Sequence, residues 1–299
     1  TQQSLKAVIM MFGKNHGFLL VQMYFVMKRI DLIQVQHNIK IGDVCEYKEP
    51  NVTEDCIFYA DGEPIGFYIS KMPEKMCKLA DLANTEFNSK RVPKQEMTRT
   101  NLKVIKDENG KVIGCQDRQD LNGGGIVKQM SAIIGSTAPK PHLGRNYPNR
   151  HSNHQIKSAQ NFIKAMLLLA NESENLLKQI LPKQWAKQNE IFQQVPDKWK
   201  FGNLWTSSIS NYNISAPFHK DGLNIVGAVN VIICKKLNAK GGDLHIPDYD
   251  ATIGQQDNSI LVYPAWKNVH GVTPIIPTHE DGYRNSLVFY PLKAFVGLK

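Results

Sequence analysis

The segment LWTSSISNYNISAPFHKDGLN, residues 204–224, is the stretch around which the rest of the chain can be interpreted. It ends in His219-Lys220-Asp221, with one residue between an imidazole and a carboxylate. Side chains two positions apart on an extended segment point to the same side, so both groups can reach one ion. Gly222 follows and allows a sharp turn. The motif therefore predicts part of a metal site, and the remaining ligand must come from elsewhere.

His270 lies 51 residues after His219, in the segment Val269-His270-Gly271-Val272. Two histidines and one carboxylate occupy one face of an octahedral Fe(II) ion in non-haem oxygenases, which leaves three positions for a bidentate cosubstrate and O2. His245 and His279 are competing ligands. We rank them lower, because His245 follows a glycine turn and His279 lies in a polar loop.

Arg284 and Ser286 are also two residues apart, which places both on one face of a strand. A guanidinium pairs bidentately with a carboxylate and a hydroxyl adds another bond, as the distal carboxylate of 2-oxoglutarate requires. Competing interpretations are core histidines, a turn role for Asp221 and a structural salt bridge for Arg284. Together, the three motifs predict a site for Fe(II), 2-oxoglutarate and O2.

Short strands separated by glycine and proline turns dominate the chain from Lys200 onward, which indicates a β-sandwich or barrel. We expect an α+β chain with a jelly-roll core at residues 200–299, on which a helical and mixed N-terminal region, residues 1–199, is packed. The expected strands of the core are Leu204–Ile214, Ile225–Cys234, Asp243–Ile246, Ser259–Tyr263, Val269–Ile276 and Ser286–Tyr290.

The N-terminal region alternates between strand, turn and helix patterns. Asp61-Gly62 and Asp107–Gly110 are hairpin signals, and the proline-rich segment 136–154 is expected to be a loop. Apolar residues at helical spacing predict three helices. The predicted elements of this region are strands Ile30–Val35, Ile39–Val44, Cys56–Ala60, Pro64–Ile69, Leu102–Ile105 and Lys111–Cys115, and helices that begin near Glu74, at His154 (to Leu181) and at Gln184 (to Gln194).

Positive charge is concentrated in the middle of the chain. The net charge is +9, and residues 101–200 carry 15 Lys/Arg against 8 Asp/Glu. No acidic residue occurs between Asp120 and Glu172. Such a segment is typical of a surface that faces phosphates, although a solvated basic face has the same composition. Within it, Arg145 and Arg150 are our candidates for contacts with the phosphates of a nucleic-acid backbone, and a merely solvated loop is the alternative.

Five cysteines, at positions 45, 56, 77, 115 and 234, show no CxxC and no paired spacing. This usage favours reduced thiols and an intracellular location, in the cytoplasm or the nucleus. The apolar runs Ala7–Phe12 and Phe18–Met27 are each too short to span a bilayer, so we expect no membrane segment. Nothing in the sequence indicates an obligate protein partner.

The last hundred residues resemble the TET/JBP family of Fe(II)- and 2-oxoglutarate-dependent nucleic-acid dioxygenases, which includes phage-encoded members. The resemblance rests on His219-Lys220-Asp221, on His270-Gly271-Val272-Thr273-Pro274 and on Arg284-Asn285-Ser286-Leu287-Val288-Phe289-Tyr290. It implies a double-stranded β-helix core and hydroxylation of the C5-methyl group of 5-methylcytosine or thymine in DNA. Since that methyl group is inaccessible inside a duplex, the base must be flipped out.

The resemblance also implies two contacts with the base. Asn224 matches an asparagine that contacts the flipped base, and Tyr290 matches an aromatic residue that stacks on it. The alternatives are a turn cap for Asn224 and a core aromatic for Tyr290. Leu292 departs from the family, because TET enzymes that read 5-methylcytosine have a histidine there. The identity of the base is therefore open.

Two other functions remain open at this point. The same chemistry could act on a free nucleoside, on RNA or on a protein side chain. A protein of another class, a catalytically inactive DNA-binding module, would share the basic segment but has no need of the complete ligand set. The acid-free segment favours a polyanionic substrate over a small molecule.

Overall fold

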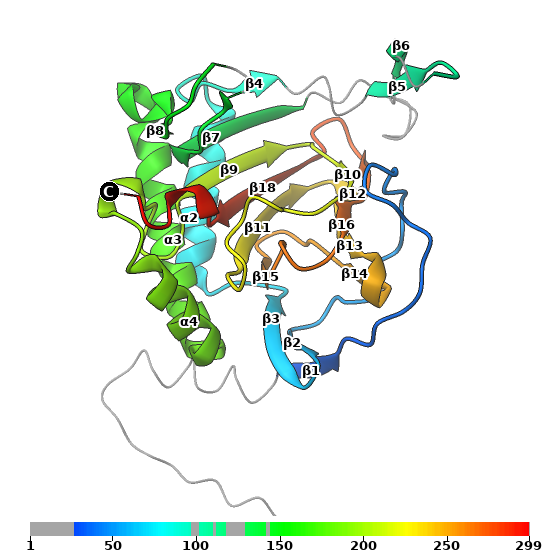
Figure 1. Cartoon of the computed structure of the whole chain (residues 1–299), viewed down its shortest axis with the longest axis horizontal. Helices are drawn as coiled ribbons and strands as arrows, with labels where there is room; N and C mark the ends of the chain where they lie inside the picture. Colours follow the sequence, from blue (N-terminus) through cyan, green and yellow to red (C-terminus); the bar gives the residue numbers. More distant parts are fainter. Residues whose placement is uncertain (1–26, 97–101, 110–111, 118–128, 142–143, 299) are drawn as a thin grey trace, which may run out of the picture.

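The computed structural model describes residues 27–96, 102–109, 112–117, 129–141 and 144–298 (Figure 1). Its centre is a ten-stranded sheet in the order β1-β2-β3-β15-β11-β18-β9-β7-β4, with β8 paired to β7. The strands of this larger sheet are β1 (Lys28–Asp31), β2 (Cys56–Ala60), β3 (Glu63–Ile69), β4 (Gln95–Glu96), β7 (Met130–Thr137), β8 (Asn149–Arg150), β9 (Ser207–Tyr212), β11 (Asn230–Leu237), β15 (Ile260–Tyr263) and β18 (Tyr283–Tyr290).

A smaller, four-stranded sheet has the order β10-β16-β13-β14. Its strands are β10 (Ala216–His219), β13 (Leu244–Ile246), β14 (Ala251–Ile253) and β16 (His270–Val272). Two further strand pairs are β12 (Ala239–Gly241) with β17 (Ile275–Pro277), and β5 (Leu102–Lys106) with β6 (Val112–Asp117). The predicted α+β fold with a jelly-roll core is confirmed, and the larger sheet draws strands from both parts of the chain.

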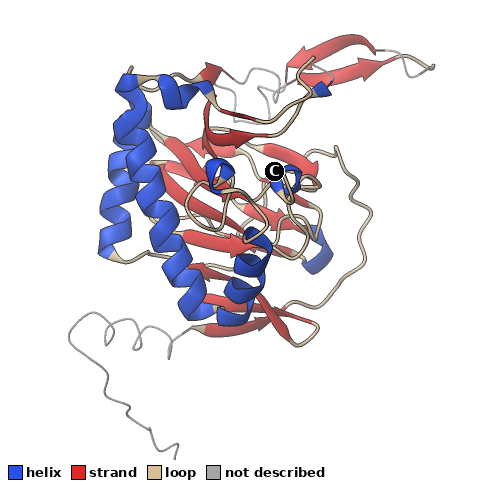
Figure 2. Cartoon of the chain, turned by 60° about the vertical axis from the view of Figure 1, so that its left-hand side comes forward, coloured by secondary structure: helices blue, strands red, loops and turns tan. Residues whose placement is uncertain are grey.

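Helices cover the larger sheet on the face opposite the smaller sheet (Figures 1 and 2). Apolar residues at helical spacing on these helices pack against the sheet and form the main core. The helices are α2 (Glu74–Asn88), α3 (Gln160–Ile180) and α4 (Pro182–Phe192), with short 3-10 turns at Ser152–Gln155, Lys157–Ala159, Asp197–Trp199, Pro247–Tyr249 and Lys293–Phe295.

Strand β18 shows how the sheet separates core from cavity. Leu287 and Phe289 are fully buried in the core beneath the helices. Arg284, Ser286 and Tyr290 alternate with them and line a cavity of about 400 Å³ on the other face. Because successive side chains of a strand point to opposite faces, the same strand contributes to packing and to the cavity.

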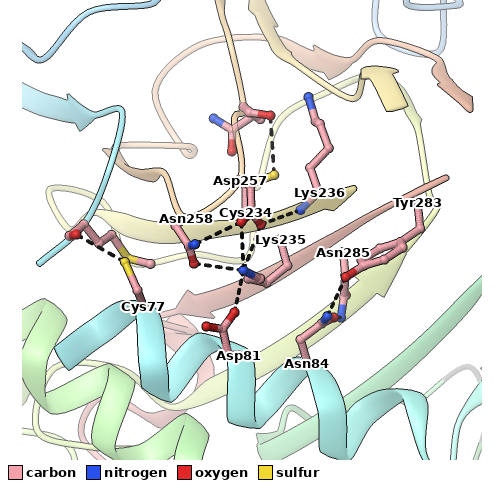
Figure 3. A network of polar contacts seen from close by, with 12 residues as sticks. Cys77, Asp81, Asn84, Cys234, Lys235, Lys236, Asp257, Asn258, Tyr283 and Asn285 are labelled. Carbon is pink, nitrogen blue, oxygen red and sulfur yellow. Dashed lines mark hydrogen bonds and ion pairs between the residues drawn. The ribbon is translucent and has the colours of Figure 1, made fainter. Parts of the chain in front are cut away.

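A polar network attaches α2 to the back of the sheet (Figure 3). The Lys235 ammonium lies 2.6 Å from a carboxylate oxygen of Asp81 and 2.8 Å from one of Asp257. Burial lowers the pKa of Lys235, but its hydrogen bonds and charge interactions with the two aspartates raise it more, so the net shift is upward. On the same helix, Asn84 accepts a hydrogen bond from the Asn285 amide. These contacts fix the helix layer to β11 and β18.

Several predicted elements differ in the structure. The strand predicted at Ile30–Val35 is β1, which ends at Asp31, and Val269–Ile276 forms parts of two strands, β16 and β17, in different sheets. No strand forms at Ile39–Val44, because residues 32–50 follow an irregular path that contacts the smaller sheet through single hydrogen bonds, such as Gly42 N–H to the Phe218 carbonyl. The segment 136–154 is not all loop, since β7 extends to Thr137 and β8 pairs with it. The long helix starts at Gln160 rather than His154, because two 3-10 turns precede it.

The sequence also led us to expect reduced cysteines and no membrane segment. Cys45, Cys56, Cys77 and Cys234 are buried and free, and the Cys115 side chain lies outside the described residues. No helix in the described part of the chain is long and apolar enough to cross a membrane. The residues of the two apolar runs that precede Met27 also lie outside the described residues.

Candidate metal and cosubstrate site

The smaller sheet brings the two histidines together. His219 ends β10, His270 begins β16, and the two residues are direct partners in the antiparallel register. Their ring centroids are 4.4 Å apart. Asp221 follows β10 by two residues, and its Oδ1 lies 3.6 Å from His219 Nε2. One ligand atom of each of the three residues lies within 4.8 Å of the others, so the group could hold a metal ion.

Both imidazole rings are oriented by their own strands. His219 Nδ1 lies 2.8 Å from the Pro217 carbonyl oxygen, and His270 Nδ1 lies 3.1 Å from that of Asn268. A carbonyl only accepts, so each Nδ1 carries the proton and each Nε2 keeps its lone pair. Burial, then the charge of His219, lowers the pKa of His270 against the opposing effect of Asp221. The neutral imidazole that a metal requires is therefore favoured.

Two amides orient the Asp221 carboxylate. Its Oδ2 lies 3.0 Å from Asn230 Nδ2 and 3.3 Å from Asn224 Nδ2, and Asn224 Nδ2 lies 2.9 Å from Asn230 Oδ1. Since a carboxylate only accepts, both amide nitrogens must face it, which also fixes the orientation of both amides. Oδ2 is thereby occupied, and Oδ1 faces His219.

The other end of the cavity holds a buried cation. Arg284 and Ser286 are each 3% exposed, and both line the cavity. Among the described residues, Arg284 has no ion pair, and its buried Nε has no hydrogen-bond partner. A buried charge of this kind is costly unless something pairs with it, so an anion is the expected occupant.

Gln255, which sequence reasoning missed, lies at the same cavity. It is fully buried, and neither its Oε1 nor its Nε2 has a hydrogen-bond partner among the residues that the structure describes. Its backbone N–H donates to Asp243 Oδ1 over 2.7 Å, which fixes the residue in place. No motif marks Gln255 or Asn230, because their relevance depends on tertiary contacts with residues far away in sequence.

The residues assigned to the base also line the cavity. Tyr290 lies there, and burial raises its pKa to about 12, with a smaller opposing effect of a hydrogen bond from Ser207. Leu292, the position that departs from the family pattern, is 9% exposed and forms an isolated bridge with Asn224. Asn224 and Leu292 are thus neighbours at one wall of the cavity.

Arg145 and Arg150 lie elsewhere. Neither lines the cavity. Arg145 donates to the Asn149 and Thr137 side chains and to the Ala138 carbonyl. Arg150 donates to Ser136 and to the Lys200 carbonyl, and burial lowers its pKa. Both guanidiniums brace the hairpin of β7 and β8, and their contact with DNA stays a prediction.

The competing histidines are outside the ligand group. His245 Nδ1 lies 2.9 Å from Thr252 Oγ1 on the neighbouring strand β14. His279 is exposed and lies 2.8 Å from a carboxylate oxygen of Asp281. Within the described part of the chain, His219, Asp221 and His270 form the one group of three such side chains close enough to share an ion.

The chain has the double-stranded β-helix, or jelly-roll, fold. Its structure is similar to that of NgTET1, solved in complex with 5mC DNA, with a TM-score of 0.56 and 14% identity over 88% of this chain and 85% of that one. No family model and no curated protein sequence matches the chain.

Two further solved structures match less well. One is an oxidoreductase of the 2OG-Fe(II) oxygenase family from Burkholderia pseudomallei, with a TM-score of 0.38, 12% identity, and coverage of 75% of this chain and 84% of that one. The other is OsALKBH1, with a TM-score of 0.37, 11% identity, and coverage of 76% and 98%. Of these three structures, NgTET1 is the one with a TM-score above 0.5.

Proposed function

We propose that the protein is an Fe(II)- and 2-oxoglutarate-dependent dioxygenase that hydroxylates the C5-methyl group of 5-methylcytosine or thymine in DNA. One observation carries the proposal: a single cavity holds a three-residue ligand group and, apart from it, a buried arginine without an anionic partner. The ligand group suits the metal, and the buried arginine suits the distal carboxylate of the cosubstrate.

The ligand group fits Fe(II) by its donors. The metal would be bound by Nε2 of each histidine and by Oδ1 of Asp221. The other nitrogen of each histidine and the other oxygen of Asp221 are already engaged in hydrogen bonds. Such second contacts fix the ligands and raise metal affinity. Bound iron would supply, with O2 and 2-oxoglutarate, the oxidation that converts a methyl C–H to C–OH while the cosubstrate becomes succinate and CO2.

The opposite end of the cavity fits the cosubstrate's distal carboxylate. Arg284 would pair with it, and the Ser286 hydroxyl and the Gln255 amide N–H can each donate a further hydrogen bond. Binding would remove the cost of leaving the Arg284 Nε and the Gln255 amide buried without partners. These residues hold and orient the cosubstrate, and none of them needs to change its protonation.

The cavity wall beside Asp221 offers contacts for a pyrimidine base. The Asn224 amide nitrogen is engaged with Asp221 and Asn230, so its oxygen is the group left to accept a hydrogen bond from a base. Both 5-methylcytosine and thymine carry a suitable donor, so this contact allows either base. Tyr290 supplies an aromatic surface. The solved complex of NgTET1 with 5mC DNA, together with the net charge of +9, supports DNA as the substrate.

Mass spectrometry of nucleosides tests the proposal. DNA with 5-methylcytosine, or with thymine as its one 5-methylpyrimidine, is incubated with enzyme, Fe(II) and 2-oxoglutarate and then digested. A hydroxymethyl nucleoside is expected from one of the bases. The His270→Ala variant should give no product yet retain its affinity for DNA in a gel-shift assay.

Failure on both bases would contradict the proposal. Parallel reactions with free nucleosides and with RNA then separate the alternatives: product in either would move the activity to that substrate. DNA binding by a wild-type protein that neither consumes 2-oxoglutarate nor modifies any of these substrates would instead identify an inactive DNA-binding module.

A further inference from the structure

The loop that follows the Asp221 ligand forms part of the cavity wall, and we call residues 222–227 the rim loop. Leu223 lines the cavity and is 66% exposed, and Val226, three residues on, is 68% exposed. Between them, Asn224 and Ile225 are buried. The loop therefore buries its centre and leaves two aliphatic side chains in solvent, with Leu223 at the cavity and Val226 three residues further along the loop.

The backbone of the rim loop is firmly held. Ile225 N–H donates to the Pro291 carbonyl over 2.9 Å, and Lys293 N–H donates to the Leu223 carbonyl over 3.0 Å. The Lys293 ammonium also donates to the Gly222 carbonyl over 2.8 Å. Because these hydrogen bonds fix the backbone, Leu223 and Val226 cannot become buried by a rearrangement of the loop. Both side chains therefore stay exposed on the surface of the folded protein.

Three exposed lysines surround this pair. Lys220 immediately precedes the Asp221 ligand and lines the cavity, and Lys293 contacts Gly222. The Lys187 ammonium lies 3.0 Å from the position that a Cβ on Gly227 would occupy, so α4 brings it over the end of the loop. In the described part of the chain, none of the three has a carboxylate within ion-pairing distance, although the charge of Lys220 contributes to the lowered pKa of Asp248. Their charges are available to an external anion.

We propose that the rim loop enters the DNA duplex at the flipped base, with Leu223 and Val226 against the exposed neighbouring bases and with Lys187, Lys220 and Lys293 on phosphates. The inference rests on the proposed function and names the surface that would carry it out. A base that leaves the stack opens an apolar gap, and proteins that distort DNA commonly fill such gaps with aliphatic side chains. Lysines around the loop would supply the phosphate contacts that position it.

The Leu223→Ala/Val226→Ala double variant tests the wedge. Turnover is measured on a duplex and on the same modified strand without its complement, where no stacked partner has to be opened. We expect kcat/KM on the duplex to fall about tenfold or more, because unstacking is no longer compensated, and kcat/KM on the single strand to change less than about twofold. Retained single-strand turnover also shows that the variant is folded.

Leu168→Ala is the matched control, since Leu168 is a half-exposed leucine on α3, in the layer behind the sheet. It should leave both rates unchanged. Fluorescence of 2-aminopurine placed beside the target base gives a readout without turnover: the wild type should raise it on binding and the double variant should raise it less.

The lysines are tested by the salt dependence of duplex binding. Removing all three charges by substitution with alanine should reduce the slope of log K against log[salt] by roughly 0.9 for each phosphate that is no longer neutralised. Lys78→Ala is the matched control, because Lys78 is exposed on α2, behind the sheet and outside the acid-free segment. It should leave the slope unchanged.

Two outcomes overturn the inference and leave the proposed function standing: equal loss on duplex and single strand, or no loss on either. Absence of product from wild type on every DNA substrate would instead contradict the proposed function itself. The two failures are therefore distinguishable in one set of reactions.

Discussion

At the scale of single residues, Asp221 connects the metal site to the wall of the cavity. Its Oδ2 accepts hydrogen bonds from Asn230 and Asn224, which keeps Oδ1 directed at His219. Asn230 lies on β11 of the larger sheet, whereas both histidines belong to the smaller sheet. The metal site is thus oriented from both sheets.

The Asn230→Ala variant should weaken binding of the metal. Loss of a hydrogen bond to a ligating carboxylate typically lowers metal affinity by about 10–100-fold. Calorimetric titration with Mn(II), which requires no turnover, measures the effect. Asn211→Ala is the control, because Asn211 lines the same cavity without contacting Asp221. Equal affinities in wild type and Asn230→Ala would refute this role.

His154 makes the stability of the protein depend on pH. Its Nε2 accepts a hydrogen bond from the Gly135 N–H over 2.6 Å, which only a neutral ring can do. Burial, then the charges of Arg150 and His151, lowers its pKa to about 4. Since the unfolded side chain has a pKa near 6.5, the unfolded state binds the proton first as pH falls.

The contribution of His154 to the free energy of unfolding should therefore be fully present above pH 6.5 and should decrease as the pH falls toward 4. The contribution of His154 to this decline is about 2 kcal/mol between pH 7 and pH 5. Urea unfolding of wild type and His154→Gln at the two pH values measures it, since the variant should lose this part of the pH dependence. Parallel pH curves for the two proteins would rule it out.

At the scale of elements, β7 shows why prediction from the sequence was incomplete. Prolines and glycines in residues 136–154 indicate a loop, yet β7 runs through Gly135 to Thr137 and pairs with β9. Gly135 has φ +84°, and a Cβ there would lie 2.7 Å from the Thr206 carbonyl oxygen. Gly135, one residue before the predicted loop, is therefore required by the close packing of β7 against the start of β9.

Gly135→Ala should destabilise the protein by about 2 kcal/mol or more, because it combines an unfavourable φ with a backbone clash. Gly144→Ala separates the two effects: Gly144 has φ +74° but nothing within 4 Å of a Cβ, so it should cost about 1 kcal/mol. Urea denaturation gives both values. Similar losses for the two variants would show that the clash is relieved.

Strand β10 marks the limit of pattern reading for elements. It has four residues, includes Pro217 and lacks a clear alternation, so the sequence did not indicate it, although it carries His219. Conversely, the alternation in Ile39–Val44 suggested a strand that does not form. Short elements at the edge of a sheet are determined by tertiary contacts more than by local propensity.

At the scale of the whole molecule, ligand binding should be visible in stability. The proposed site for the metal and 2-oxoglutarate is assembled from strands that are distant in sequence, so both ligands should bind the folded state alone. At a hundredfold excess over Kd, a ligand adds about 2.7 kcal/mol to the free energy of unfolding. Thermal unfolding with Mn(II) and 2-oxoglutarate should show a higher Tm for wild type, and no such increase for His219→Ala. An unchanged wild-type Tm would speak against this site.

The parts of the site that the sequence could predict are those with a fixed spacing. His219 with Asp221, and Arg284 with Ser286, are pairs that share a strand or its extension, so local geometry indicates them. Asn230 and Gln255 approach the site through the sheet and through a loop, and only the fold brings them there. Charge alone indicates Arg145 and Arg150, and neither lines the cavity, whereas Lys220 does.

The most direct test of the central claim is the stoichiometry of products from one reaction. Succinate and hydroxymethyl nucleoside are quantified together after incubation with Fe(II), 2-oxoglutarate and DNA that contains 5-methylcytosine or thymine. The account predicts that succinate forms in step with the hydroxymethyl base, one for each, and that neither forms with His270→Ala. Succinate released at the same rate with and without DNA, and no hydroxymethyl base, would contradict it.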